Sequence, residues 1–227
     1  MTLGYRPELD GFRGVAVLLV LLFHSGCPWF RGGFIGVDLF FVLSGFLITT
    51  ILVQEWQRRG RISYGKFLMR RMLRLLPALW LMCALYFAII LAAGYDWQRH
   101  ALDTLYALTY ISNWTRALGY YRPDLLGHTW SLSIEEQFYL LWPWLLLLLL
   151  TLASRSRLRI GIVVMMAIGF AIERALMALD NVSYWRLYNG LDTHADPLLI
   201  GCALALYYLS LIHISEPTRL RRISYAV

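Results

Sequence analysis

Long apolar blocks alternate with short polar segments along the whole chain. Most blocks reach the roughly 17–25 residues that an α-helix needs to cross a bilayer, and the last is marginal. A shorter apolar block at residues 102–114 predicts a re-entrant or interfacial helix, or else a seventh span. The pattern predicts an all-α, polytopic membrane bundle of about six spanning helices plus one short re-entrant or interfacial helix. The predicted spans lie at about residues 12–29, 34–53, 75–93, 131–153, 160–179 and 197–212.

Composition supports this reading and explains the basic charge. Of the 227 residues, 59% are hydrophobic and 15% are charged, whereas a soluble domain usually carries about 25% charged residues. The net charge of +7 is nearly all arginine, since Lys66 is the only lysine. These charges lie in short clusters between apolar blocks, which indicates membrane topology rather than nucleic-acid binding. Three scattered cysteines fit neither a disulfide framework nor a zinc site, so we expect no metal.

Arginine clusters predict the orientation. Residues 54–74 carry seven basic side chains and should be cytoplasmic, as should the next cluster at 154–159. Two spans between them return the chain to the same side, which places the N-terminus in the cytoplasm and excludes a full crossing by 102–114. The first segment could instead be a lipoprotein signal peptide ending in "FHSGC" at 23–27. His24 fits such a cleavage site poorly, so a retained span is favoured.

Arg13 and His24 stand near opposite ends of the first span. They are eleven residues apart, which on a helix is about 16 Å of rise and a return to within about 20° of the same face. An arginine that snorkels to the interface and a structural histidine would explain them without a function. Ionisable groups inside a membrane are costly, so a functional role is the better interpretation.

The second span places a carboxylate near its outer end. Asp38 needs a partner there, and His24 on the adjacent span is the nearest candidate, because a carboxylate can orient an imidazole. Small residues nearby allow two helices to approach closely, which is their structural role. They are Gly33, Gly36, Ser44 and Gly45.

A third polar cluster precedes the fourth span. Ser133 and Glu136 fit a capping box, which is a purely structural motif. His128, Ser131 and Glu135 share one helical face if the helix begins early. On the predicted topology they lie at the same end as His24 and Asp38. The histidine, carboxylate and hydroxyl groups would then converge near the outer face, where they could perform acid–base chemistry on a hydroxyl substrate.

Three arginines form one patch at the start of the third span. Arg70, Arg71 and Arg74 have i, i+3 and i, i+4 spacing on a helix. Two explanations fit these arginines equally well. They could anchor the helix at the inner face, with lipid phosphates as partners. They could also bind a phosphorylated cytosolic donor, since guanidinium groups clamp phosphate bidentately.

These segments, taken together, closely resemble the acyltransferase-3 family of bacterial integral membrane O-acyltransferases. The resemblance runs from about Tyr5 to Leu206. Each motif alone is modest, but several in the same order and spacing are specific. The segments are "YRPELDGFRGVAVLLVLLFH" (5–24), "GGFIGVDLFFVLSGFLI" (32–48), "RRMLRLLPAL" (70–79), "HTWSLSIEEQFYLLWP" (128–143) and "LDTHADPLLIGCALAL" (191–206).

The resemblance implies roles for particular residues. Arg13 and His24 match a motif of arginine, ten residues and histidine, and His24 matches its catalytic base. Arg71 and Arg74 match paired arginines of the donor site, which Arg70 and Arg13 would extend. Other matched positions are Asp38, Trp130, Ser131, Glu135 and Glu136. The segment "HADP" departs from the family, because His194 stands where an arginine is expected and Pro197 where a small residue is expected.

The resemblance implies transfer of an acyl group, commonly acetyl, from cytosolic acyl-CoA to a hydroxyl of an extracytoplasmic glycan or lipid-linked saccharide. No cofactor would be bound permanently. His24 would remove the hydroxyl proton, and Asp38 or Glu135 would orient the imidazolium. An acyl-His or acyl-Ser131 intermediate would make the reaction two-step. The alternatives are a membrane transporter, which also carries intramembrane Asp, Glu and His, or a non-catalytic component of glycan export.

The expected setting is the bacterial inner membrane, with lipids, acyl-CoA and the glycan acceptor as partners and no nucleic acid. Residues 1–211 are predicted to form a partial membrane acyltransferase domain. The abruptly polar residues 212–227 are predicted to be an unrelated or disordered tail. Family members have more spans than this chain, so we expect the fragment to lack later ones and to be inactive if these are required.

Overall fold

The structure is a computed structural model that describes residues 7–121, 123, 125–153 and 155–215. In these residues the secondary structure is helical, without a strand. This confirms the predicted all-α class. In chain order the elements are α1 (Pro7–His24), η1 (Pro28–Phe30), α2 (Ile35–Arg59), α3 (Tyr64–Ala92), α4 (Trp97–Leu108), α5 (Ser112–Ala117), η2 (Leu125–His128), α6 (Thr129–Leu152), α7 (Ser156–Leu179), α8 (Tyr184–Asn189), α9 (Leu191–His194) and α10 (Asp196–Ser215).

Four of the described helices are long and apolar enough to cross a membrane, namely α2, α3, α6 with the η2 turn before it, and α7. The two other predicted spans differ from these. Helix α1 has 18 residues but carries Glu8, Asp10 and Arg13 in its first half, and the apolar part of α10, Asp196–Leu211, is shorter. A multi-pass helical membrane protein is therefore supported, while spanning by α1 and α10 stays a prediction.

The chain divides into two compact units. The first comprises residues 1–61, 145–169 and 196–227, and the second comprises residues 62–144 and 170–195. The boundary passes through α6 and α7, so each of these helices contributes one part to each unit. The predicted site residues are distributed over both units.

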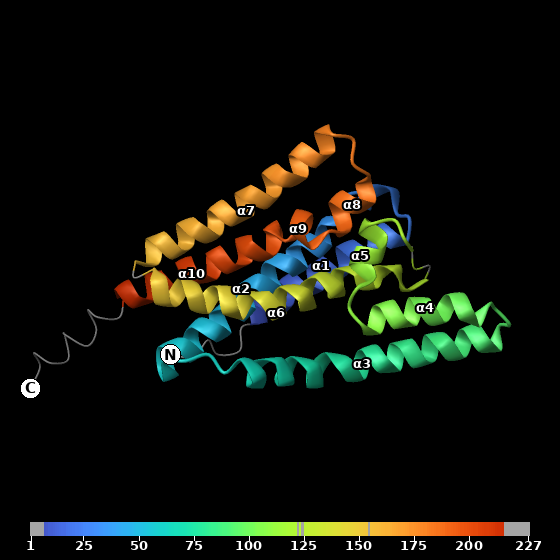
Figure 1. Cartoon of the computed structure of the whole chain (residues 1–227), viewed down its shortest axis with the longest axis horizontal. Coiled ribbons are helices and arrows are strands. Elements are labelled where there is room, and N and C mark those ends of the chain that lie inside the picture. Colours follow the sequence, from blue (N-terminus) through green and yellow to red (C-terminus); the bar gives the residue numbers. More distant parts are fainter. Residues whose placement is uncertain (1–6, 122, 124, 154, 216–227) are drawn as a thin grey trace, which may run out of the picture. The chain divides into compact units, whose positions relative to one another are not determined.

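In the first unit, α2 packs against both α1 and α10, and α2 and α10 lie side by side in Figure 1. Glycines make both contacts close. A Cβ atom on Gly36 would lie 2.5 Å from the Ala16 carbonyl oxygen of α1. A Cβ atom on Gly45 would collide with the Leu198 carbonyl of α10, and one on Gly201 with the Val42 carbonyl of α2. The predicted helix-packing role of Gly36 and Gly45 is thus confirmed.

Gly45→Ala should destabilise the α2–α10 contact, because backbone atoms cannot yield to the added methyl group as a flexible side chain would. We expect a loss of about 1–3 kcal/mol, typical of overpacking, measured by thermal unfolding in detergent. Gly161→Ala in α7 is the matched control, since a Cβ there meets nothing within 4 Å. Equal stability of Gly45→Ala and the parent would contradict the close packing.

In the second unit, α4 turns back along the C-terminal half of α3 (Figure 1). Leu79, Cys83, Tyr86 and Ile90 of α3 form a buried core with Ala107 of α4. Helix α4 has 12 residues, or about 18 Å, well short of the roughly 30 Å of hydrocarbon that a span must cross. The 102–114 block is broken at Tyr110, which adopts a positive φ of 54°. It therefore forms two short helices rather than a seventh span.

Several helix boundaries differ from the predicted spans because hydropathy does not detect polar helical turns. Helix α1 begins at Pro7 and ends at His24, where Gly26, with a φ of 72°, and Pro28 break it. The predicted span 12–29 was therefore placed too late. Helix α3 begins at Tyr64, eleven residues before the predicted span 75–93, so the arginine cluster lies within a helix.

Candidate functional site

In the first unit, Arg13 and His24 lie on one continuous helix, α1, as their spacing predicted. Arg13 forms an i, i+3 ion pair with Asp10, at 3.6 Å between the guanidinium nitrogen and carboxylate oxygen. Both side chains are partly exposed to solvent, so this pair contributes little stability. Arg13 therefore keeps a charge that a ligand could use.

The imidazole of His24 is held by its own helix. Its Nδ1 lies 2.8 Å from the Val20 carbonyl oxygen, and its ring packs edge-on against Phe23. A carbonyl oxygen can only accept, so Nδ1 carries the proton of the neutral ring and Nε2 keeps a lone pair. The ring is thus in the tautomer that a general base at Nε2 requires.

Asp38 lies in the first turn of α2 and is half-buried. A helix N-terminus favours a carboxylate there, because the backbone N–H groups give it a positive partial charge. The recorded polar contact of His24 is with Val20 and not with Asp38. Orientation of His24 by Asp38 stays a prediction.

In the second unit, the start of α6 differs from the predicted capping box. The helix begins at Thr129, so Ser133 and Glu136 lie inside it. Ser133 Oγ lies 3.0 Å from the Thr129 carbonyl and 2.8 Å from Ser112 Oγ. The capping-box interpretation was wrong, because these buried hydroxyl groups join α6 to α5 instead of capping the helix.

The other predicted residues of this segment lie near the beginning of α6. Ser131 Oγ lies 3.3 Å from the His128 carbonyl, and His128 Nδ1 lies 3.1 Å from the Leu125 carbonyl in η2. Ser131 and Glu135 are half-buried. Ser131 and Glu135 share a helix, while His128 is in the preceding 3-10 turn. The predicted convergence of these groups with His24 and Asp38 would join the two units and stays a prediction.

Arg70, Arg71 and Arg74 lie on α3, as predicted, in two different environments. The guanidinium carbon of Arg71 lies 3.7 Å from the centre of the Tyr139 ring, a cation–π contact with a buried aromatic side chain of α6. Arg70 and Arg74 are exposed. No ion pair is recorded for Arg70 or Arg74 with any carboxylate of the described residues, so both can meet an anionic ligand or lipid.

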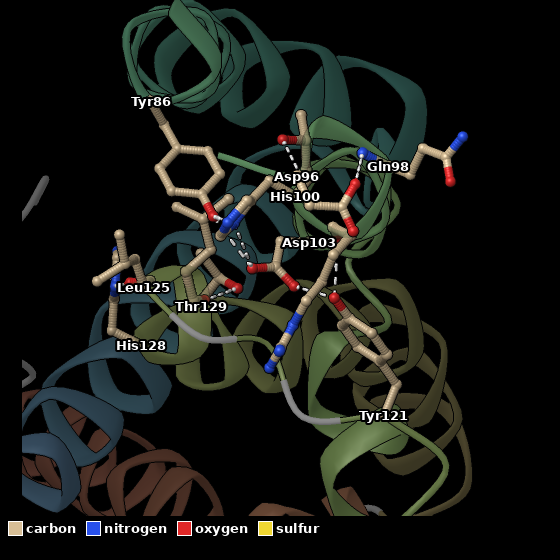
Figure 2. Close-up of polar contacts among 12 residues, drawn as sticks. Tyr86, Asp96, Gln98, His100, Asp103, Tyr121, Leu125, His128 and Thr129 are labelled. Atoms are coloured by element: carbon tan, nitrogen blue, oxygen red, sulfur yellow. Dashed lines mark hydrogen bonds and ion pairs between the residues drawn. The ribbon is translucent and has the colours of Figure 1, made fainter. Parts of the chain in front are cut away.

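Sequence reasoning missed a buried cluster formed by Tyr86, His100, Asp103 and Tyr121, which we call the α3–α4 clasp (Figure 2). Asp103 is fully buried. It accepts hydrogen bonds from Tyr121 at 2.6 Å and from Tyr86 at 3.1 Å. The Tyr86 hydroxyl also lies 2.6 Å from His100 Nδ1. The clasp thus joins α3, α4 and the loop before η2.

One signal of the clasp was present in the sequence. His100 and Asp103 have i, i+3 spacing, and Asp103 interrupts an apolar block. The two tyrosines lie outside α4, 17 and 18 residues from Asp103, so helical spacing alone could not identify them.

Tyr121→Phe should remove the loss of stability that we expect the clasp to show at alkaline pH. Burial, followed by the hydrogen bond to Asp103, raises the pKa of Tyr121 to about 12, from an ordinary value near 10. The stabilisation from this raised pKa is fully present below about pH 10 and is lost as the pH rises through about 12. Tyrosinate absorbance during an alkaline titration follows the ionisation of Tyr121. Tyr120→Phe is the control, since Tyr120 is 84% exposed. Identical titrations for the two variants would contradict the clasp.

A second polar network lies between α5, α6 and α8. The amide of Gln137 accepts from Trp114 Nε1 at 3.0 Å and donates to the Tyr110 carbonyl at 2.6 Å and to Asn113 Oδ1 at 2.9 Å. Asn113 in turn donates to the Asn189 carbonyl at 3.3 Å. These bonds join the short helices α5 and α8 to each other and α5 to α6.

His194, which stands where the family resemblance leads one to expect an arginine, is buried. Its ring stacks on Trp130 with centroids 5.6 Å apart, and its Nδ1 lies 2.6 Å from the Tyr188 carbonyl. Nearby, Arg186 pairs with Asp192 through its two terminal guanidinium nitrogens. The departure at this position therefore fits a packed structural histidine.

Comparison with known proteins decides the family. A family model described as an acyltransferase domain matches residues 6–226. The chain belongs to the acyltransferase-3 family. This confirms the resemblance drawn from the motifs. No solved structure matches the chain.

Curated relatives of the chain include peptidoglycan O-acetyltransferase OatA of Listeria monocytogenes, 36% identical over 218 residues, which cover 90% of this chain and 34% of the relative. Putative peptidoglycan O-acetyltransferase YrhL of Bacillus subtilis is 39% identical over 214 residues, with 90% and 33% covered. O-acetyltransferase OatA of Staphylococcus aureus is 39% identical over 214 residues, with 90% and 35% covered.

This chain spans about a third of the length of these relatives. The family match extends to residue 226 and so includes the segment from 212 that was predicted to be an unrelated tail. Helix α10 continues to Ser215, and residues 216–227 lie outside the described part. The predicted domain boundary at 211 stays a prediction.

Proposed function

We propose that the chain transfers an acetyl group from cytosolic acyl-CoA to a hydroxyl group of an extracytoplasmic glycan. The observation that carries this proposal is the family match over nearly the whole chain, together with relatives that are named O-acetyltransferases. The glycan class follows from the same relatives, two of which are named for peptidoglycan.

His24 is the proposed base. Its Nε2 takes the proton of the acceptor hydroxyl while that oxygen attacks the thioester carbonyl. The carbon–sulfur bond then breaks, and the CoA thiolate leaves and receives the proton from the imidazolium. The hydrogen bond from Nδ1 to Val20 supports this role because it keeps Nε2 unprotonated in the neutral ring. Asp38 or Glu135 is proposed to stabilise the imidazolium.

The donor is proposed to enter from the cytoplasmic side and to bind through its phosphates. Arg70 and Arg74 are exposed on α3, and Arg71 lies beside them, so the three can form charge-assisted hydrogen bonds with phosphate oxygens. Arg13 on α1 would add charge along the same route. An acyl-His24 or acyl-Ser131 intermediate fits the same residues in a two-step version.

Release of free thiol by the purified, membrane-reconstituted chain tests the activity. Acetyl-CoA should be consumed faster when a peptidoglycan fragment with a free hydroxyl is added, and the fragment should gain an ester. A transporter or a non-catalytic export component would consume no thioester. Absence of thiol release with every acyl-CoA and acceptor tried would contradict the proposal.

Reporter fusions test the proposed orientation. A reporter near Gly60 or Ser156 should behave as cytoplasmic, and one near Arg122 or Asn189 as external, because arginine-rich loops stay inside. An external signal at Gly60 would reverse the side from which the donor enters and would overturn this part of the proposal.

A further inference from the structure

A cavity of about 590 Å³ opens in the second unit between α3 and α6. We call it the α3–α6 pocket, and its volume is within the range of about 300–1,000 Å³ that small-molecule sites occupy. Most of its wall is apolar. The apolar lining side chains used below are Leu68, Met72 and Leu75 of α3 and Leu140 and Leu141 of α6.

Most polar groups in the wall of the pocket already form hydrogen bonds within the protein. The side-chain oxygen of Gln137 accepts from Trp114, and its nitrogen donates twice within the network with Tyr110 and Asn113. The Thr109 hydroxyl donates to the Leu105 carbonyl at 2.7 Å. A ligand in the pocket therefore meets chiefly hydrocarbon and few free hydrogen-bonding groups.

Glu136 differs from these groups, because it brings a buried and unpaired acceptor to the wall. Its side chain lines the pocket, and its buried Oε1 has no hydrogen-bond partner among the described residues. The positive charge of Arg71 acts on this carboxylate, yet no ion pair joins the two, and Arg71 Nε is also buried without a hydrogen-bond partner. An unused acceptor in an apolar wall is costly unless a ligand supplies the donor.

The pocket and the arginine cluster share one region of α3. Leu68, Met72 and Leu75 line the pocket at i, i+4 and i+7 spacing, and Arg71 lies on the same side at i+3. The exposed Arg70 and Arg74 lie within the same two turns. This arrangement suits a molecule with an anionic head and a long neutral arm that carries at least one N–H or O–H donor.

We propose that the α3–α6 pocket binds the neutral arm of the acyl-CoA donor, and that Glu136 accepts a hydrogen bond from an amide N–H of that arm. This inference rests on the proposed function and adds a positioning residue to it, Glu136, which is distinct from the predicted Glu135. The chain of a membrane lipid is a poorer occupant, because a hydrocarbon against Glu136 leaves its carboxylate without a donor.

Equilibrium binding to the whole chain in lipid nanodiscs separates the two ends of the ligand. The probes are CoA, adenosine bisphosphate as its phosphate-bearing end, and pantetheine as its arm. Leu140→Trp fills the pocket. It should weaken CoA and pantetheine binding about ten-fold or more and leave adenosine bisphosphate unchanged. Leu148→Trp is the matched control, since Leu148 is about as exposed as Leu140 on the same helix, 52% against 48%, and does not line the pocket.

Glu136→Leu should weaken CoA and pantetheine about ten- to a hundred-fold, the equivalent of a lost hydrogen bond to a charged group. Glu136→Gln keeps the shape and one acceptor oxygen, so it should rescue most of this loss. Arg74→Ala should show the opposite selectivity and weaken adenosine bisphosphate and CoA but not pantetheine.

The outcomes distinguish this inference from the proposed function. CoA binding and thiol release that are equal in Leu140→Trp and Leu148→Trp would leave the function standing and overturn the pocket assignment. Loss of all three ligands in Leu140→Trp would mean a damaged fold and would also count against it, since Leu148→Trp bears the same bulk. Displacement of a co-purified lipid by Leu140→Trp, without any change in CoA binding, would assign the pocket to lipid instead. Failure of the parent to bind CoA would remove the function and the inference together.

Discussion

Replacing His24 by alanine should reduce acyl transfer by about 10²- to 10⁴-fold, the usual cost of removing a general base, while insertion and CoA binding stay intact. His24→Gln should be nearly as poor, because it keeps a hydrogen-bonding group but cannot accept the proton. Steady-state thiol release measures both variants against the parent.

His128→Ala is the matched control for His24→Ala. Both histidines are exposed, and both bond Nδ1 to a backbone carbonyl of the preceding turn, so a loss confined to His24 identifies the base by position rather than by local geometry. Arg13→Lys should reduce acyl transfer less than Arg13→Ala does, if the positive charge near the beginning of α1 matters more than the shape of the guanidinium group. Retention of more than about a tenth of the turnover by His24→Ala would move the base elsewhere, first to His128 or Glu135.

Hydrophobic patterning was enough to predict the helical class, and the small residues of the second span were enough to predict that other helices pack closely on it. A long apolar block leaves the backbone few alternatives to a helix in a membrane, and glycines at Gly36 and Gly45 indicate close approach of helices. Helix ends were predicted less well. The turns at the beginning of α1 and α3 are helical although their charged residues lower the hydropathy there, so a hydropathy pattern places both helix starts too late.

In the candidate site, too, the sequence predicted some features and could not predict others. Spacing correctly placed Arg13 with His24 on one helix, and Arg71 with Arg74 on another. It could not show that Val20 holds the His24 ring, that Tyr139 holds Arg71, or that Glu136 faces a pocket, because each depends on where the side chain points. The capping-box assignment of Ser133 failed for a related reason. Contacts with Ser112, on another helix, decided its role.

Replacing both Arg71 and Arg74 by alanine should weaken apparent acyl-CoA affinity tens- to thousands-fold and change acceptor affinity much less. Each charge-assisted contact with phosphate is worth about 1.5–3 kcal/mol, and every 1.4 kcal/mol is about ten-fold in affinity. Lysine at both positions should rescue only in part, because it keeps the charge and loses the bidentate geometry.

The two single variants should differ. Arg74 is exposed, so Arg74→Ala should remove only the proposed contact with the donor, whereas Arg71→Ala also removes the contact with Tyr139 and should cost some stability. Arg155→Ala combined with Arg157→Ala is the control, since it removes two exposed arginines from the other predicted cytoplasmic cluster. Donor titrations of thiol release measure the effect. If a properly inserted Arg71→Ala, Arg74→Ala variant has the same donor dependence as this control, then α3 carries its arginines for membrane topology, and the phosphates of the donor must bind elsewhere.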